Sequence, residues 1–354
     1  MLSSATLSDA SVIRGFDLRS VLADEWGKLA DYQFPWAARA MDLAGAVIDT
    51  VEPSLIVTYA EAGDWGRALV LEARRRRIPI VGVQHGFIHR HWLYYLHEPD
   101  EIRQSEANPA DRGFPLPDMT LIFDEFARQH LIHAGHFPPQ AVAVTGNSRL
   151  ESFVEAAQKL STDDVERIRE AVGVRPGQHL VVFASKYIAE FDGVIRELVN
   201  AVREMSDVHL VMKCHPADAV EPYERLAEGL SNVSVTDAST SLGSLTAAAR
   251  LLVTVNSTAA IEAMVLGTPA LALSLPNFLS PFIEAGAMAG TYRVEEIAPV
   301  LRDLIEDDEC RERLTAGRRD FLSRYGMNSG SGSARRAAEK IIELARHSSM
   351  AARN

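Results

Sequence analysis

Apolar residues follow two different rhythms along this 354-residue chain. From residue 1 to about 50 they recur at helical spacing, as in VLADEWGKLADY and AARAMDLAGAVIDTV. From residue 55 onward, short β-branched runs alternate with helical stretches, a pattern typical of β-α-β units. The first series predicts strands at 55–59, 78–83, 119–123 and 142–146, with helices near 65–77 and 124–134.

A second series of strands begins after a capped helix and a Pro-Gly turn within 161–178. Its strands are predicted at 180–185, 208–214, 233–236, 251–255 and 270–274. Strands that are apolar at nearly every position indicate parallel sheets covered on both faces. We therefore expect an α/β protein of two doubly wound, Rossmann-like domains, 1–160 and 161–354. The last sixty residues, from Val294, predict two or three amphipathic helices interrupted at 328–333.

The amino-acid composition indicates which partners and which compartment to expect. With 36 Lys and Arg against 48 Asp and Glu, the net charge of −12 disfavours a nucleic-acid partner. The two cysteines, Cys214 and Cys310, have no metal-ligand spacing, which favours a reducing compartment. No apolar run has the length of a signal peptide or of a membrane span, so we expect a soluble, cytoplasmic protein.

One basic run, Arg74 to Arg77, interrupts the acidic composition. It falls at the end of a predicted helix, where cations offset the negative end of the helix dipole. The alternative is a patch for the inner face of a membrane, which would make the protein peripheral to it.

The residues with the strongest chemical signal are Asn256, Ser257 and Thr258, between a buried strand and a helix. Backbone N–H groups, hydroxyls and the positive end of the helix dipole would converge there on an anion, and phosphate is the expected guest. The alternative is that Ser257 or Thr258 simply caps the helix.

Five further residues of the second domain support a phosphate site. His215 and Pro216 follow the strand at 208–214, so the histidine would sit at the ligand-facing edge of the sheet. Ser185 and Lys186 follow the first strand of this domain, and the lysine could supply a point charge. Glu262 lies one helical turn after Thr258, where a carboxylate could accept hydrogen bonds from a ribose diol.

In the first domain, Gln84, His85 and Gly86 end a buried strand. We expect His85 to be a general base at the cleft edge and Gly86 to permit a tight turn or a close ligand approach. Glu61 and Asp64, after the strand at 55–59, are the competing bases, although Asp64 could instead cap a helix.

Three more histidines follow at 89, 91 and 97, but they have no carboxylate at ligand spacing. We therefore expect no metal. Asn147 and Arg149 follow the last strand of this domain and could line an interdomain cleft. The chain contains no Walker lysine loop, no Gly-rich dinucleotide motif and no nucleophile elbow.

The ordered set QHG, PDMTLIFDEFARQHLIHAG, VAVTGNSRLESF, KCHPAD and VNSTAAIEAMVLGTPAL resembles bacterial surface-polysaccharide transferases of the GT-B fold. These include capsule-type Kdo and sialic acid transferases and CDP-glycerol glycerophosphotransferases. The resemblance implies two domains whose parallel sheets face a central cleft. It also implies a nucleotide held by His215, Pro216, Ser257 and Thr258. Such domains usually open with a strand and a Gly-rich turn, so the helical start here indicates a shortened acceptor-side domain.

The resemblance implies metal-independent transfer of a sugar or polyol phosphate from a nucleotide-activated donor, of cytidine type, to a glycan hydroxyl in the cell envelope. The partners would be a nucleotide-sugar donor and a glycan acceptor, with peripheral association with the membrane or with envelope-assembly proteins left open. One alternative is an isomerase resembling UDP-GlcNAc 2-epimerases, with Glu61, Asp64 or Glu284 near the sugar. Another is a non-catalytic nucleotide-sugar-binding or assembly protein. The sugar, the acceptor and the oligomeric state stay open.

Overall fold

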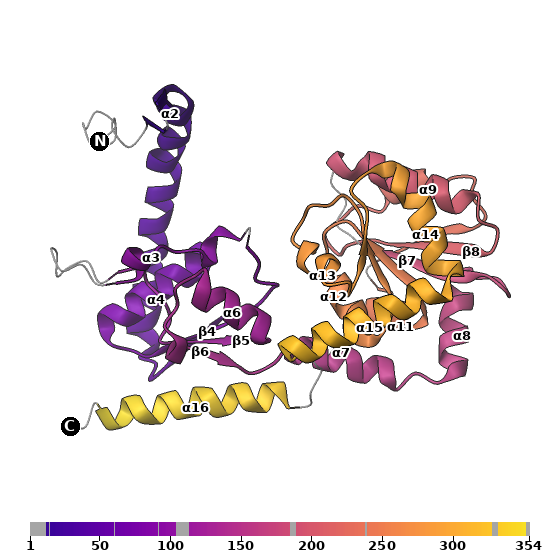
Figure 1. The fold of residues 1–354 in the computed structure, drawn as a ribbon. Coiled ribbons are helices and arrows are strands. Elements are labelled where there is room, and N and C mark those ends of the chain that lie inside the picture. The colour runs from indigo at the N-terminus through magenta and orange to yellow at the C-terminus, as the bar shows by residue number, and fades with distance from the viewer. Residues whose placement is uncertain are drawn as a thin grey trace.

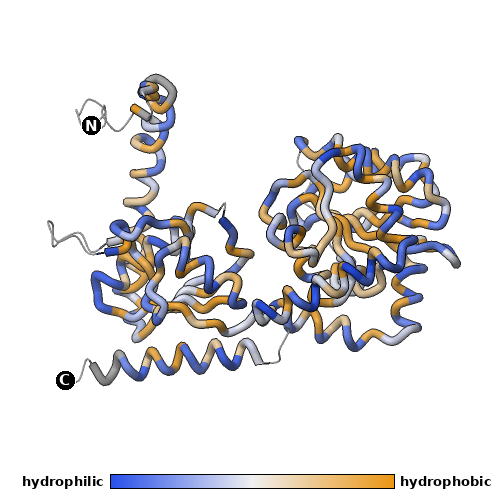
Figure 2. Tube along the Cα trace, in the orientation of Figure 1, coloured by the Kyte–Doolittle hydropathy of each residue, from blue (hydrophilic) through white to orange (hydrophobic). Residues whose placement is uncertain are grey.

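The computed structural model describes residues 12–13, 15–59, 61–90, 92–103, 113–184, 189–237, 239–327 and 332–351. These residues form two parallel-sheet α/β Rossmann-like domains, which confirms the predicted fold class (Figure 1). Strands of the second sheet are hydrophobic along their length, whereas the last helix alternates between hydrophobic and hydrophilic residues (Figure 2).

The first domain contains a four-stranded parallel sheet in the order β3-β4-β5-β6. Its strands are β3 (Ile56–Tyr59), β4 (Ile80–Val83), β5 (Met119–Ile122) and β6 (Val142–Val144), and its main helices are α4 (Asp64–Arg76) and α6 (Glu125–His133). Short helices α5 (Pro99–Ile102), η2 (Leu93–Tyr95) and η3 (Pro139–Ala141) lie in the connections. All four predicted strands are present, and the polar residues that follow them belong to loops.

The N-terminal region differs in part from the helical prediction. Residues 12–17 contain a short antiparallel pair, β1 (Val12–Ile13) and β2 (Phe16–Asp17), which turns at Gly15 with φ +82°. Helix α2 (Arg19–Lys28), the π-helix η1 (Leu29–Gln33) and helix α3 (Phe34–Val51) then follow, and α3 packs on α4. The helical prediction for 1–11 lies outside the described residues.

The second domain contains a six-stranded parallel sheet in the order β12-β11-β10-β7-β8-β9. Its strands are β7 (His179–Ala184), β8 (Val208–Lys213), β9 (Val233–Thr236), β10 (Leu251–Thr254), β11 (Ala270–Ala272) and β12 (Ala289–Gly290). The two-residue β12 was not predicted, because a run so short carries no periodic signal.

Helices cover both faces of this second sheet. Phe183 and Val253 pack with the apolar faces of α9 (Asp192–Arg203) and α14 (Ile297–Glu306). Leu252 packs with α12 (Ala259–Leu266) and α13 (Ser280–Glu284). The remaining helices are α8 (Thr162–Ala171), α10 (Glu221–Ala227), α11 (Leu242–Ala248) and α15 (Asp308–Tyr325), with the short η4 (Ala189–Phe191) and η5 (Val294–Glu296).

The last helix, α16 (Ser333–Ala351), returns to the first domain (Figure 1). Register places Ile80 and Ile122 on the face that packs with α4 and α6, so Val83 and Leu121 face the opposite way. On that opposite side they line a pocket together with Ala337 of α16. The chain end therefore contributes to the covering of the first sheet.

The boundary predicted at residue 160 stays a prediction. Helix α7 (Ser148–Gln158), on its N-terminal side, contacts α11 and α12 of the second domain. Helix α7 therefore follows the last strand of the first sheet in the chain but packs with helices of the second domain.

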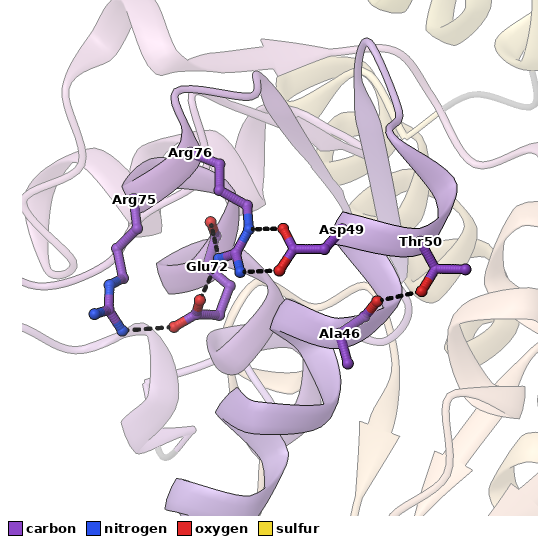
Figure 3. Close-up of polar contacts among 6 residues, drawn as sticks. All are labelled: Ala46, Asp49, Thr50, Glu72, Arg75 and Arg76. Atoms are coloured by element: carbon purple, nitrogen blue, oxygen red, sulfur yellow. Dashed lines mark hydrogen bonds and ion pairs between the residues drawn. The ribbon is translucent and has the colours of Figure 1, made fainter.

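The basic run at the end of α4 is paired with carboxylates in part (Figure 3). Arg76 donates to both oxygens of Asp49, at 2.6 and 2.7 Å, and also pairs with Glu72. Arg75 donates to the other oxygen of Glu72 at 2.9 Å. Through Asp49, these contacts connect the C-terminal end of α4 to α3. Within the described ranges, no helix combines the length and apolarity needed to cross a bilayer.

Candidate functional site

A polar pocket of about 520 Å³, the hydroxyl pocket, lies at the carboxyl edge of the second sheet. Its walls include Lys213, His215, Pro216, Ser239, Ser257 and Thr258. The expected phosphate-site residues from two separate loops therefore meet around one cavity, as parallel strands of a doubly wound sheet allow. Ser185 and Lys186 lie outside the described residues, so their predicted role stays a prediction.

His215 is held in one tautomer by its own turn. Its Nδ1 accepts the backbone N–H of Ala217 at 3.1 Å, which places the proton of the neutral ring on Nε2. The side chain is exposed at the pocket wall. A neutral histidine in this state can donate a hydrogen bond from Nε2 to an anion.

The turn before α12 has both features expected of it. The N-cap of α12 is Thr258, and the hydroxyl of the preceding Ser257 accepts the N–H of Ala259, the first residue of the helix, at 3.2 Å. Ser257 and Thr258 also line the hydroxyl pocket, where the positive end of α12 faces the cavity. Asn256 is exposed and is not among the lining residues, so it is the one member of the predicted trio away from the pocket.

A second pocket, the interdomain pocket of about 170 Å³, lies between the two domains. Its apolar walls include Tyr59, Phe87, Leu121, Ile261 and Met327. Its polar wall includes Gln84, His85, Asp124, Asn147, Arg149 and Glu262. An apolar cavity with a few convergent polar groups is the usual form of a small-molecule site.

The two pockets share Arg149, Thr258 and Glu262. Arg149, from α7, donates to the carboxylate of Glu262 at 3.1 Å. Burial raises the pKa of Glu262, and the arginine acts in the opposite direction. This pair therefore stands where a single ligand could pass from one pocket into the other.

His85 lies in the interdomain pocket, packed edge-on between Tyr59 and Trp92 with ring centroids at 5.3 and 5.2 Å. Burial lowers its pKa, so the ring is neutral at neutral pH. Its Nδ1 is buried and makes no hydrogen bond within the described part of the chain. These properties are compatible with the predicted base, whose role stays a prediction.

The neighbours of His85 have structural roles. Gln84 donates to the Gly86 carbonyl at 2.7 Å and accepts the Phe123 N–H at 2.9 Å, which ties together the loops after β4 and β5. A Cβ at Gly86 would make ordinary contact with Trp92 at 3.6 Å, and the residue has no positive φ. The surrounding protein therefore gives no steric reason for glycine at this position, and the predicted tight turn or close ligand approach stays a prediction.

The competing bases lie away from the cavities. Glu61 is 3% exposed beneath Gly82 of β4 and accepts a hydrogen bond from the Tyr95 hydroxyl at 3.1 Å. Burial raises its pKa. Asp64 is exposed as the first residue of α4, whose N-cap is Gly63. Neither carboxylate is among the lining residues of the two pockets, which corrects their placement in the cleft.

The crossing between domains begins at Gly146 and Asn147. Gly146 has φ +92°, and a Cβ there would collide with the Ser333 hydroxyl, so this position requires glycine. Asn147 caps α7 by accepting the N–H of Leu150 at 3.1 Å. Asn147 and Arg149 both line the interdomain pocket, as predicted for a cleft.

Two charged residues of the pocket walls were not among the predicted site residues. Asp124, 8% exposed, caps α6 by accepting the Ala127 N–H at 2.8 Å, and burial raises its pKa from 3.8 to about 6. Lys213 ends β8 and is buried at the wall of the hydroxyl pocket. Asp124 lies two residues past the end of β5 and Lys213 is the last residue of β8, and these positions were the available signal. Among the described residues, no group of three or more His, Cys, Asp or Glu side chains could share a metal ion.

Comparison with known proteins supports the fold and indicates which kind of reaction to consider. No protein-family profile matches the chain. A protein of Ralstonia solanacearum named "Probable UDP-N-acetylglucosamine 2-epimerase" is 23% identical over 317 residues, covering 86% of this chain and 81% of the relative. A second, from Ralstonia nicotianae and with the same name, is 24% identical over 316 residues.

Solved structures share the two-domain fold. UDP-GlcNAc 2-epimerase from Neisseria meningitidis, bound to UDP-GlcNAc, has a TM-score of 0.58 at 17% identity, covering 81% of this chain and 80% of that one. A glycosyltransferase from Rickettsia africae also has a TM-score of 0.58, at 12% identity, covering 87% of this chain and 81% of that one. The chain has a GT-B-like fold, as expected.

The function expected from the sequence is corrected by these relatives. The sequence relatives named above carry the name of 2-epimerases and not of capsule-type or glycerophosphate transferases. Their names specify a uridine nucleotide, whereas a cytidine donor was expected. The glycosyltransferase prediction is therefore wrong, and the comparisons favour its isomerase alternative.

Proposed function

We propose that this protein is an enzyme that inverts the configuration at C2 of the sugar in a UDP-activated N-acetylhexosamine. The observation that carries this proposal is the junction of the two pockets at Arg149 and Glu262. A nucleotide in the hydroxyl pocket would place its sugar in the interdomain pocket. The similarity of most of the chain to proteins named 2-epimerases supports the same reaction.

The nucleotide end of this ligand would meet groups suited to a diphosphate. His215 can donate from Nε2, and the start of α12 brings its dipole and the Thr258 hydroxyl to the same cavity. Glu262 keeps the role predicted for it, that of accepting hydrogen bonds from the ribose. Its pairing with Arg149 fixes the carboxylate at the point where the pockets meet.

The sugar end needs groups that move a proton. Inversion at C2 requires a proton to leave from one face of the carbon and another to return on the opposite face. His85 and Asp124 both line the interdomain pocket. Burial lowers the pKa of the histidine, so its neutral ring can accept a proton, and raises that of the aspartate to about 6, which brings this carboxyl closer to neutrality.

Incubation of the protein with UDP-GlcNAc and no acceptor, followed by proton NMR, tests the proposal. We expect signals of the C2 epimer to grow until the two sugars reach equilibrium. Binding of UDP without any conversion would contradict the enzyme and would favour a non-catalytic nucleotide-sugar-binding protein.

Two variants test the proposed proton-transfer pair. Asp124→Asn retains the oxygen that caps α6, and His85→Gln retains a polar side chain of similar length. We expect each to lower kcat by about 10²- to 10⁴-fold. Glu61→Gln is the matched control, because this carboxyl is buried but lies outside the pocket walls. An unchanged kcat in Asp124→Asn and His85→Gln would remove these residues from the mechanism.

A further inference from the structure

Lys213 is a buried cation at the wall of the hydroxyl pocket. It is the last residue of β8, and its side chain is 6% exposed. Cys214 and His215 follow it around the same cavity, and Ser257 and Thr258 line it from the loop after β10. Lysine is seldom buried to this extent without an anionic partner.

The partners of Lys213 are neutral. Its Nζ donates to the carbonyl of Cys214 at 3.2 Å and to the carbonyl of Asp237 at 2.6 Å. In the part of the chain that the structure describes, no carboxylate lies within ion-pair distance of this nitrogen. The Asp237 carboxylate instead accepts the N–H and the hydroxyl of Ser239.

An ammonium group has three N–H donors, and two of them are used here. Burial lowers the pKa of Lys213, since its charge is removed from water without a carboxylate in contact. A buried charge of this kind is stabilised when an anion occupies the adjacent cavity. The same cavity is lined by the start of α12, which is its positive end, and by His215, so its groups favour negative charge.

We propose that Lys213 is an anion-binding residue that donates its third N–H to a phosphate oxygen of the nucleotide in the hydroxyl pocket. The ligand class is a nucleoside diphosphate, and the inference rests on the proposed function for the identity of that ligand. Lys213 binds from the end of β8, whereas His215 binds from the turn that follows. The two carbonyl bonds hold the ammonium in place before the ligand arrives, which reduces the entropy lost on binding.

Titration calorimetry with uridine, UMP and UDP tests this assignment in wild type, Lys213→Met and Lys213→Arg. Methionine removes the charge at similar length, and arginine retains it. We expect Lys213→Met to bind UDP about 10- to 100-fold more weakly, the range for a hydrogen bond to a charged group, and uridine with unchanged affinity. Lys213→Arg should recover part of the lost affinity for UDP.

A matched control is Lys159→Met, which removes an exposed lysine that follows α7 and is not among the pocket-lining residues. It should bind all three ligands as wild type does. If Lys213→Met loses affinity for uridine and UDP equally, Lys213 only holds the loops of Cys214 and Asp237 together and does not bind phosphate, which would overturn the inference. An unchanged affinity for UDP would overturn its phosphate role directly.

Failure of the inference is distinguishable from failure of the proposed function. If wild type binds none of the three ligands, the nucleotide site itself is wrong. If Lys213→Met does not fold, a crystal structure of the wild-type protein with UDP decides the matter. We expect Nζ of Lys213 at hydrogen-bond distance from a phosphate oxygen, about 2.7 to 3.2 Å. A separation beyond about 5 Å, with UDP bound in this pocket, would overturn the inference.

Discussion

The buried carboxyl of Asp124 costs stability at neutral pH, and Asp124→Asn should remove that cost. Its pKa rises from 3.8 to about 6 in the native state because the group is buried. The native state therefore binds this proton more tightly than the unfolded state does. The resulting stabilisation is complete below pH 3.8 and is lost as the pH rises through about 6. A shift of this size corresponds to about 3 kcal/mol.

Urea unfolding of wild type and Asp124→Asn between pH 4 and pH 7 measures this effect. Asparagine keeps an oxygen to accept the Ala127 N–H, so the cap of α6 survives. The variant should gain stability relative to wild type as the pH rises, approaching about 3 kcal/mol at pH 7. Asp307→Asn, at the exposed N-cap of α15, reports what the same substitution does without burial. If the free energies of unfolding of Asp124→Asn and wild type differ by the same amount at every pH, the reasoning is refuted.

Three further predictions concern the contacts between domains. Gly146→Ala should cost about 2 kcal/mol in thermal unfolding, since it forces a side chain into a positive φ and against Ser333. Phe87→Ala should cost about 2 kcal/mol and split the calorimetric transition in two, because the ring packs against Phe282 of the second domain at 5.0 Å. Glu151→Gln should speed amide exchange in the first turn of α16, whose Ser333 N–H the carboxylate accepts at 2.8 Å. The backbone N–H groups of Gly332 and Ser333 both donate to this carboxylate and lower the pKa of Glu151 from 4.5. In wild type, the protection of the Ser333 amide from exchange should therefore hold above pH 4.5 and fade as the pH falls through the lowered pKa.

The strands could be predicted because they are short, apolar and β-branched. Runs such as LVVF and LLVT are short and rich in β-branched residues, which favours a buried strand over a buried helix segment. Their carboxyl ends then locate the loops that line the pockets, and this is why His215, Thr258 and His85 were found by position. The antiparallel pair at 12–17 was missed because two-residue strands have no periodicity.

Contacts between distant segments could not be predicted from local pattern. Nothing in the sequence of α16 indicates that Ala337 would line a pocket with Leu121 of the first sheet. The aromatic cluster of Phe87, Phe278 and Phe282 likewise joins a loop of one domain to a segment of the other. From its neighbouring sequence alone, each of these side chains is predicted only to be an ordinary core residue.

The direction of a buried charged side chain decides whether it belongs to a site, and that direction is a property of the fold. Glu61 follows a strand, as a catalytic carboxylate should, but packs beneath Gly82 and away from the pockets. Asp124 follows a strand in the same way, yet it lines the interdomain pocket. The sequence offers the two as equals, and only the direction of each side chain relative to the sheet separates them.

The most direct test of the central claim is the fate of the hydrogen at C2. UDP-GlcNAc incubated with the protein in D₂O should acquire deuterium at C2, in step with formation of the C2 epimer, as followed by proton NMR. Asp124→Asn should bind UDP normally and slow this exchange by about 10²-fold or more. Retention of the C2 proton by UDP-GlcNAc that is bound in the joined pockets would contradict the account.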